Sequence, residues 1–350
     1  MKIIKNSFII LIFISYFLIF GKPLTPELSF IPVFVEDLEL ERIGSDTSED
    51  SFINFELNGK FGYLDGEGGI LFSENILYGV AVDKSGFINY SRQNNVLVLR
   101  DRDGHYVNRV DLAGYPFFTQ ERRFILSYYN NGISEIDQEG NILWRKTFSS
   151  SVSSVSATDS LTFVGTVDGS VRILNLDGDI LFLEDTRASR INIVYGGSIS
   201  LNSKNLVTVT GIEPQLLSLW INTGNSYDVE ATWTLNSELR RHAVTGFSDD
   251  GLFAYVEADE ELLFIELKTK KMYSIPISGR LQHLSLKGDS GLVHILGLDQ
   301  KGYYYIISEL KGNILFNTRL SGDNVFLKKD GNRIIIGIEN SLIGYDMVSM

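Results

Sequence analysis

Histidine is the residue type best suited to metal binding and proton transfer near neutral pH. The chain has four: His105, His242, His283 and His294. No two of them have the i, i+4 spacing that places both imidazoles on one helix face. His283 and His294 fall on two adjacent expected strands, where their side chains could meet. Because the chain has no cysteine, thiolate nucleophiles and cysteine-ligated zinc are excluded. We expect polar or core histidines and no metal site.

Two aspartate-rich stretches have the residues with which calcium loops begin: Asp101-Arg102-Asp103-Gly104 and Asp249-Asp250-Gly251. Both lack the regular ligand series and the distal glutamate of a twelve-residue calcium site, so a hairpin turn is the simpler interpretation. The serine-rich run from Ser149 to Ser154 has no Gly-x-Ser-x-Gly nucleophile signature. We interpret it as a small-residue strand near an axial channel. The sequence therefore predicts no catalytic residue and no cofactor.

Arginines are grouped at three places in this acidic chain, and they are the candidates for partner binding. One interpretation is scattered, solvated charge; the other is an arginine-lined face that binds an acidic or β-strand partner. The candidate residues are Arg122, Arg123, Arg187, Arg190, Arg240 and Arg241.

The bulk composition narrows the class of protein. The net charge of −13 disfavours a nucleic-acid partner and broad docking on anionic lipid. Hydrophobic residues make up 44% of the chain, enough for a large core without disulfides. Six prolines and 32 glycines suit many short strands joined by tight turns.

The N-terminal segment, residues 1–21, has two lysines followed by an apolar run from Ser7 to Phe20. This run has the length of a signal-peptide core and is shorter than a spanning helix. We expect export, with the segment either cleaved or retained as a membrane anchor, and the rest periplasmic or facing outward. Residues 22–50 are interpreted as a linker, in which Phe30–Val35 can form an edge strand.

The elements that position these residues can be predicted from a repeated sequence motif, which we call the phrase. In each copy an apolar run ends in Asp or Asn, a turn containing Gly follows, and the next strand begins with Ile-Leu-aromatic. The clearest copies are Ile136–Trp144 and Leu174–Phe182. Anchors at 65, 101, 137, 175, 222, 266, 309 and 346 give gaps of 36 to 47 residues, a period typical of propeller blades. The structural repeat positions are Asp65, Phe72, Asp101, Gly104, Asp137, Gly140, Trp144, Asn175, Gly178, Phe182, Gly312, Phe316 and Asp346.

Each repeat divides into four expected strands. In the fourth copy they are 152–156, 161–166, 170–175 and 179–183. Asp or Asn hydrogen-bonds its own turn, and Gly supplies the positive φ. The aromatic residue that ends the phrase is expected between adjacent blades, where it buries a large area. No segment of ten or more residues has a helical period after residue 30.

The phrase Asp-x-x-Gly-x-Ile-Leu-Trp, with Val167-Asp168-Gly169 before a third strand, resembles the repeat of pyrroloquinoline-quinone-type β-propellers and their non-enzymatic relatives. WD40 repeats are a second relative, although the Trp-Asp ending is missing. The enzymes of the first group commonly carry adjacent cysteines and a calcium-bound cofactor. Because this chain has no cysteine, the resemblance implies the binding and assembly-factor branch of the group, such as propellers that assist outer-membrane protein insertion.

We predict an all-β chain whose residues 51–350 form a single β-propeller of four-stranded blades, eight favoured and seven the alternative. The last copy ends near Asp346 without a fourth strand, so the N-terminal stretch 30–35 is expected to supply it and close the ring. The expected function is an exported, monomeric, non-catalytic scaffold or assembly factor for protein partners in the bacterial envelope. The alternative is a cofactor- or ligand-binding propeller, enzyme or sensor, with its site in the central funnel.

Overall fold

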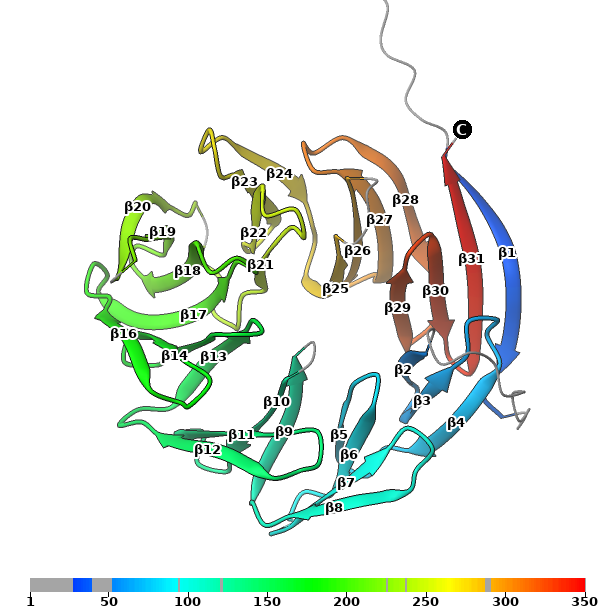
Figure 1. The fold of residues 1–350 in the computed structure, drawn as a ribbon. Coiled ribbons are helices and arrows are strands. Elements are labelled where there is room, and N and C mark those ends of the chain that lie inside the picture. Colours follow the sequence, from blue (N-terminus) through cyan, green and yellow to red (C-terminus); the bar gives the residue numbers. More distant parts are fainter. Residues whose placement is uncertain are drawn as a thin grey trace, which may run out of the picture.

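The computed structural model describes residues 28–39, 52–93, 95–119, 122–224, 226–236, 238–286 and 291–349. These residues form 31 strands in eight antiparallel sheets and contain no helix. The sheets follow one another around a ring in chain order (Figure 1). The predicted eight-bladed β-propeller is therefore confirmed, and the seven-bladed alternative is wrong.

Four blades make up the first half of the ring. Blade 1 has three described strands and the others have four. The strands are β2 (Ile53–Leu57), β3 (Lys60–Leu64) and β4 (Ile70–Asn75) in blade 1; β5 (Gly79–Val82), β6 (Gly86–Tyr90), β7 (Leu97–Asp101) and β8 (Tyr106–Val110) in blade 2; β9 (Gly114–Thr119), β10 (Arg122–Ser127), β11 (Gly132–Ile136) and β12 (Ile142–Thr147) in blade 3; and β13 (Val152–Ala157), β14 (Thr162–Thr166), β15 (Ser170–Leu174) and β16 (Ile180–Asp185) in blade 4.

The second half has four four-stranded blades. The strands are β17 (Ile191–Ile199), β18 (Asn205–Ile212), β19 (Leu216–Asn222) and β20 (Tyr227–Thr234) in blade 5; β21 (Thr245–Phe247), β22 (Phe253–Glu257), β23 (Glu261–Glu266) and β24 (Met272–Pro276) in blade 6; β25 (Arg280–Ser285), β26 (Leu292–Asp299), β27 (Gly302–Glu309) and β28 (Ile314–Leu320) in blade 7; and β29 (Val325–Asp330), β30 (Arg333–Ile338), β31 (Ser341–Ser349) and β1 (Leu28–Asp37) in blade 8.

The ring is closed by the strand nearest the N-terminus. β1 pairs antiparallel with β31, from Leu28 opposite Ser349 to Asp37 opposite Ser341 (Figure 1, blue beside red). This confirms that the stretch 30–35 supplies the missing fourth strand. Pairing the two ends of the chain in one sheet covers an edge that would otherwise expose unpaired backbone groups.

The repeated turn and the aromatic residue lock neighbouring blades together. In blade 3, Asp137 Oδ1 accepts a hydrogen bond of 2.7 Å from the Asn141 amide. In blade 4, Gly178 has a φ of +77°, and a Cβ built there would lie 2.7 Å from Cδ2 of Trp144 in blade 3. The indole therefore packs directly on the turn of the next blade. Phe34 over Gly68 and Phe72 over Gly104 repeat this arrangement. The predicted blade-to-blade packing of the phrase aromatics is confirmed at Phe72 and Trp144.

Two copies of the phrase that depart from the consensus still form turns. Asn222 Oδ1 accepts a hydrogen bond from the Gly224 amide at 2.8 Å. At the sixth anchor, where glycine is lost, Lys270 adopts the positive φ of 60° instead, and its amide donates to the Glu266 carbonyl. The turn therefore keeps its geometry in copies where the sequence motif that predicted it is incomplete.

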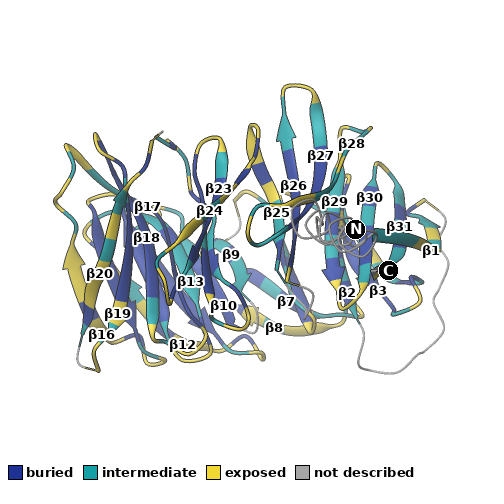
Figure 2. Cartoon of the chain, turned by 90° about the horizontal axis from the view of Figure 1, so that it is seen from above, coloured by how far each residue is buried: buried dark blue, intermediate teal, exposed yellow. Residues whose placement is uncertain are grey.

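The two ends of the blades differ in the kind of segment they carry. Because successive strands run in opposite directions, first-to-second and third-to-fourth turns gather at one end, which we call the turn face. Second-to-third turns and blade-to-blade connections gather at the other, which we call the connection face. Buried residues lie along the strands, and exposed ones concentrate in the turns and outer strands (Figure 2). Surface connections between rigid strands are where binding residues are most often found.

Candidate functional site

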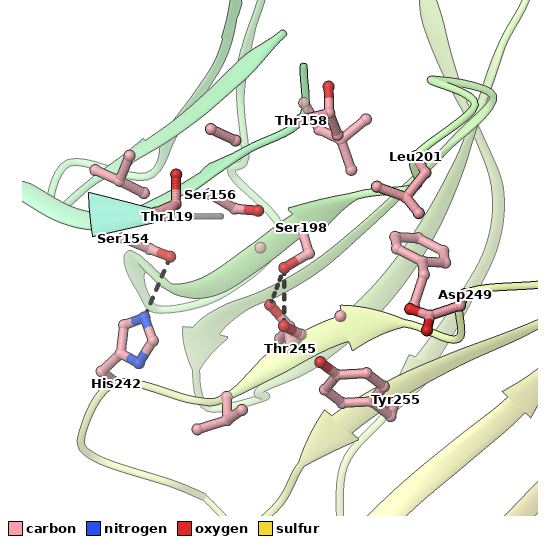
Figure 3. Close-up of a pocket in the computed structure, with 17 residues that line it drawn as sticks. Thr119, Ser154, Ser156, Thr158, Ser198, Leu201, His242, Thr245, Asp249 and Tyr255 are labelled. Atoms are coloured by element: carbon pink, nitrogen blue, oxygen red, sulfur yellow. Dashed lines mark hydrogen bonds between the residues drawn. The ribbon is translucent and has the colours of Figure 1, made fainter. Parts of the chain in front are cut away.

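A hollow of about 290 Å³ lies among the innermost strands of blades 3 to 6. It is lined by β9, β13, β17 and β21, by their adjoining turns, and by Tyr255 of β22 (Figure 3). Small residues leave this space unfilled, among them Ser154, Ser156, Gly197, Ser198 and Gly246. The prediction that the serine-rich run becomes an inner strand is confirmed for the part from Val152, where β13 begins.

Hydrogen bonds fix several polar groups of this axial pocket. Ser198 Oγ donates to the Thr245 carbonyl at 2.8 Å and lies 3.0 Å from the Thr245 hydroxyl. Ser154 Oγ lies 3.4 Å from Nε2 of His242 (Figure 3). Burial, with a smaller contribution from Asp249, raises the pKa of Tyr255 to about 12, so its hydroxyl stays protonated at neutral pH. The lining is mainly uncharged and rich in hydroxyl groups, which suits a neutral, hydrogen-bonding ligand.

The Ser154–His242 pair is not arranged as an activated nucleophile. Burial lowers the pKa of His242, Glu257 opposes this shift, and Arg241 adds to it. In a Ser-His-Asp arrangement, a carboxylate accepts a hydrogen bond from the other ring nitrogen of the histidine. Instead, Glu257 accepts hydrogen bonds from Arg241 Nη2, Leu281 N and Val244 N. Burial thus lowers the basicity of the His242 imidazole, which hydrogen-bonds within the pocket lining.

Two of the predicted partner-binding arginines lie inside the protein. Arg122 and Arg123 are adjacent on β10, so their side chains leave opposite sides of the blade. Arg122 pairs with the buried Glu135 at 2.5 Å and donates to the Thr158 carbonyl of blade 4. Arg123 pairs with Asp83 of blade 2 at 2.7 Å. Both side chains are buried and join blade 3 to its two neighbours, a structural role that the sequence did not predict. Their predicted partner contact stays a prediction.

The pKa of Asp83 reflects this buried pairing. Burial alone would raise it, but hydrogen bonds and charge from Arg123, with hydrogen bonds from Ser85, hold it below its usual range. The Asp83 carboxylate, through its pairing with Arg123, is therefore part of the framework that positions blade 2 against blade 3.

The other four predicted arginines lie on the connection face. Arg187 and Arg190 belong to the connection between β16 and β17, and Arg240 and Arg241 to the one between β20 and β21. Each is paired with a carboxylate: Asp185, Glu213, Glu238 and Glu257 respectively. Arg187, Arg190 and Arg240 are exposed, whereas Arg241 is half-buried and also donates to the Gly279 carbonyl. Their role in partner binding stays a prediction.

The histidines divide between surface and core. His294 is fully buried, and its Nδ1 lies 2.7 Å from the Tyr305 hydroxyl. Burial, with help from the charges of Lys329 and His283, lowers its pKa to about 3. His105 joins Asp101 and Asp103 in an exposed group whose ligand atoms lie within 4.8 Å. Asp101 Oδ1 there accepts the amides of Asp103 and His105, as in an ordinary turn. The absence of a metal site stays a prediction.

Sequence reasoning missed a group of tyrosines on the connection face. Tyr78, Tyr90, Tyr115 and Tyr128 come from blades 2 and 3 and form a chain of ring contacts. Their spacing in the sequence follows no helix or strand period, so no local pattern signals that they meet. The available signal was the blade period: Tyr78 and Tyr115 are 37 residues apart and Tyr90 and Tyr128 are 38 apart, which places each pair at equivalent positions of blades 2 and 3.

The fold and the axial pocket define an eight-bladed β-propeller. A family model described as "beta-propeller protein" matches residues 1–350, and the chain belongs to this family. An uncharacterized protein of Treponema pallidum (strain Nichols) is 19% identical over 354 residues, covering 98% of this chain and 94% of that protein. The quinoprotein type of the repeat, predicted from the phrase, stays a prediction.

Two solved structures share the architecture. BamB from Moraxella catarrhalis matches with a TM-score of 0.64 and 14% identity, over 91% of this chain and all of that chain. The computationally designed Ika8 protein matches with a TM-score of 0.64 and 12% identity, over 87% of this chain and 95% of that one. At these identities the similarity shows the fold.

Proposed function

We propose that this protein is an exported, monomeric, non-catalytic β-propeller that binds protein partners in the cell envelope, as a scaffold or assembly factor. The observation that carries the proposal is the whole-ring similarity to BamB, which extends over 91% of this chain. The apolar stretch 7–20 supports export, although it lies outside the described residues. No helix of the described residues is long and apolar enough to span a membrane.

The test uses the full-length protein in its own cells. Export predicts that the protein is found in the envelope fraction, with its mature N-terminus near residue 22 or with residues 1–21 retained. A general amine-reactive crosslinker should convert it into one discrete larger species, identified by mass spectrometry. A cytoplasmic protein serves as the fractionation control. Recovery from the cytoplasm with Met1 intact, and no change in size after crosslinking, would contradict the proposal.

A second candidate function is ligand binding in the axial pocket, which the hollow of about 290 Å³ favours. The ligand class that fits its hydroxyl lining is a neutral polyol or monosaccharide. Calorimetry with a panel of monosaccharides tests this directly. Saturable binding should be lost in Ser198→Val, which blocks the pocket, and kept in Ser160→Val, which changes an exposed turn. Failure of every sugar to bind would reject this function.

A further inference from the structure

Four tyrosine rings form a continuous ladder across blades 2 and 3 on the connection face. The ring centroids of Tyr78 and Tyr90 are 6.0 Å apart, those of Tyr90 and Tyr115 6.4 Å, and those of Tyr115 and Tyr128 5.3 Å. All three contacts are edge-to-face, the favoured arrangement of aromatic pairs. The next residue, Tyr129, is 87% exposed, and Tyr78 is 52% exposed. We call Tyr78, Tyr90, Tyr115, Tyr128 and Tyr129 the tyrosine surface.

The three segments that carry Tyr78, Tyr90, Tyr128 and Tyr129 have an unusual composition, whereas Tyr115 lies four residues after Asp111. Residues 76–79, 90–95 and 127–132 read Ile-Leu-Tyr-Gly, Tyr-Ser-Arg-Gln-Asn-Asn and Ser-Tyr-Tyr-Asn-Asn-Gly. Tyr, Ser, Asn and Gly with an occasional Arg is the composition of antibody binding loops. Tyrosine supplies broad contact area at low entropy cost, and the small polar residues supply hydrogen bonds. Arg92 is the one charged residue in these segments, in a chain with a net charge of −13.

Hydrogen bonds hold the blade 2 part of the surface in place. The Leu77 amide donates to Asn89 Oδ1 at 3.0 Å, and Asn89 Nδ2 donates to the Asn75 carbonyl at 2.9 Å. The Tyr78 amide donates to the Tyr90 carbonyl at 3.0 Å. The guanidinium of Arg92 lies over the Tyr78 ring, 5.9 Å from its centroid. A surface fixed before binding loses little entropy when a partner arrives.

The blade 3 part is fixed in a similar way. The turn at 127–130 is closed by the Asn130 amide, which donates to the Ser127 carbonyl at 2.8 Å, with Asn130 at a φ of 55°. Asn130 O also accepts the Val152 amide at 2.6 Å, so the turn is tied to the first strand of blade 4. Tyr129 is therefore presented to solvent from a turn that is held at both ends.

We propose that the tyrosine surface is the contact surface for a folded protein partner. This inference rests on the proposed function, because it locates the protein-binding region of the same scaffold. Tyr78 and Tyr129 are the exposed rings of this surface, and the exposed Arg92 lies over the Tyr78 ring. Exposed tyrosine and arginine side chains on a fixed backbone suit a broad polypeptide surface. The partner surface is expected to be uncharged, with a carboxylate opposite Arg92, since tyrosine and arginine dominate binding energy at protein interfaces.

The test places the photo-crosslinking amino acid p-benzoylphenylalanine at Tyr78 or Tyr129 in the full-length protein, in its own cells. Controls carry it at Leu176 and Leu252, which are 51% and 57% exposed in turns of the turn face. The same protein should be crosslinked from Tyr78 and Tyr129 and not from the controls.

The crosslinked protein is then purified, and its affinity for each variant is measured. We expect Tyr129→Ala and Arg92→Ala each to weaken binding by about 10-fold or more. Tyr106→Ala is the matched control, because Tyr106 is 64% exposed at the turn-face end of β8, and should change the affinity less than about twofold. Circular dichroism and thermal unfolding confirm that each variant is folded.

The outcomes separate this inference from the proposed function. If a general amine-reactive crosslinker captures a partner but Tyr78 and Tyr129 do not, the location is wrong and the scaffold function stands. If neither captures a protein, both fail. Purified wild-type protein is also titrated with soluble peptidoglycan oligosaccharides. Saturable binding that Tyr129→Ala abolishes would assign the surface to a glycan and overturn the protein partner.

Discussion

Replacing Gly178 by alanine tests whether the indole of Trp144 locks blade 3 to blade 4. The methyl group has two effects: alanine disfavours the φ of +77°, and its Cβ would lie 2.7 Å from Cδ2 of Trp144. Gly224 is a matched control, since it also lies in a third-to-fourth-strand turn with a φ of +95°, but nothing lies within 4 Å of its Cβ position. The difference between the two variants isolates the effect on packing.

The expected magnitudes follow from these two environments. Gly224→Ala should lower the free energy of unfolding by about 1–2 kcal/mol, the cost of a positive φ. Gly178→Ala adds the displacement of a packed ring, typically about 1–3 kcal/mol. Trp144→Ala alone should cost about 3–5 kcal/mol because it empties a buried site that is only 8% exposed. In the Trp144→Ala background, the effect of Gly178→Ala should fall to that of Gly224→Ala.

The assay is urea unfolding followed by circular dichroism, which does not depend on the tryptophan that is removed. A double-mutant cycle of Trp144 and Gly178 gives the coupling energy directly. Equal effects of Gly178→Ala and Gly224→Ala, together with zero coupling, would show that the turn does not support the indole. The repeated aromatic would then have to stabilise the ring in some other way.

Three further predictions concern the buried ion pair, the buried histidine and the closing strand. Arg122→Met should lower the free energy of unfolding by about 3–5 kcal/mol in urea titrations, because it leaves Glu135 charged and buried; a change below about 1 kcal/mol would contradict this. His294 has a folded pKa of about 3 against an unfolded value of about 6.5, so the unfolded state binds more protons between these values. Stability from this residue is therefore lost as the pH falls from 6.5 towards 3, and His294→Asn should flatten the stability profile there; an unchanged slope would show that other groups cause it. Phe34→Ala should destabilise the ring by about 2 kcal/mol or more, since its ring covers Gly68 and Gly344, whereas Val35→Ala, at an exposed position, should have little effect in thermal unfolding; equal melting temperatures would contradict this.

Strand order and ring closure were predictable because the repeated phrase specifies the local conformation of the backbone. Asp or Asn before a glycine at positive φ specifies a tight turn wherever it occurs. The four strands expected in the fourth repeat agree with β13 to β16 within one or two residues at each end. The closing strand followed from counting, since the last repeat lacked a fourth strand and the stretch 30–35 was the one unassigned apolar run near the other end.

The candidate site was much harder to predict, because it depends on which side chains meet across blades. Arg122 and Arg123 are charged and adjacent, as exposed residues often are, yet each reaches a partner on another blade or strand. Their partners, Glu135 and Asp83, are 13 and 40 residues away in sequence. Tyr78 and Tyr128 likewise join one surface only because two blades place their connections side by side. No local period encodes such contacts.

The two faces of the ring differ in how much freedom the fold leaves them. On the turn face, most third-to-fourth-strand turns keep an Asx hydrogen bond, and several keep a glycine under an aromatic ring. On the connection face, segments between blades run from the short link before β5 to the long link between Thr234 and Thr245. Residues that packing does not dictate are the ones available for binding. The connection face is therefore where we propose that the ring binds its partner, and the tyrosine surface is the region of that face to which the proposal assigns the contact.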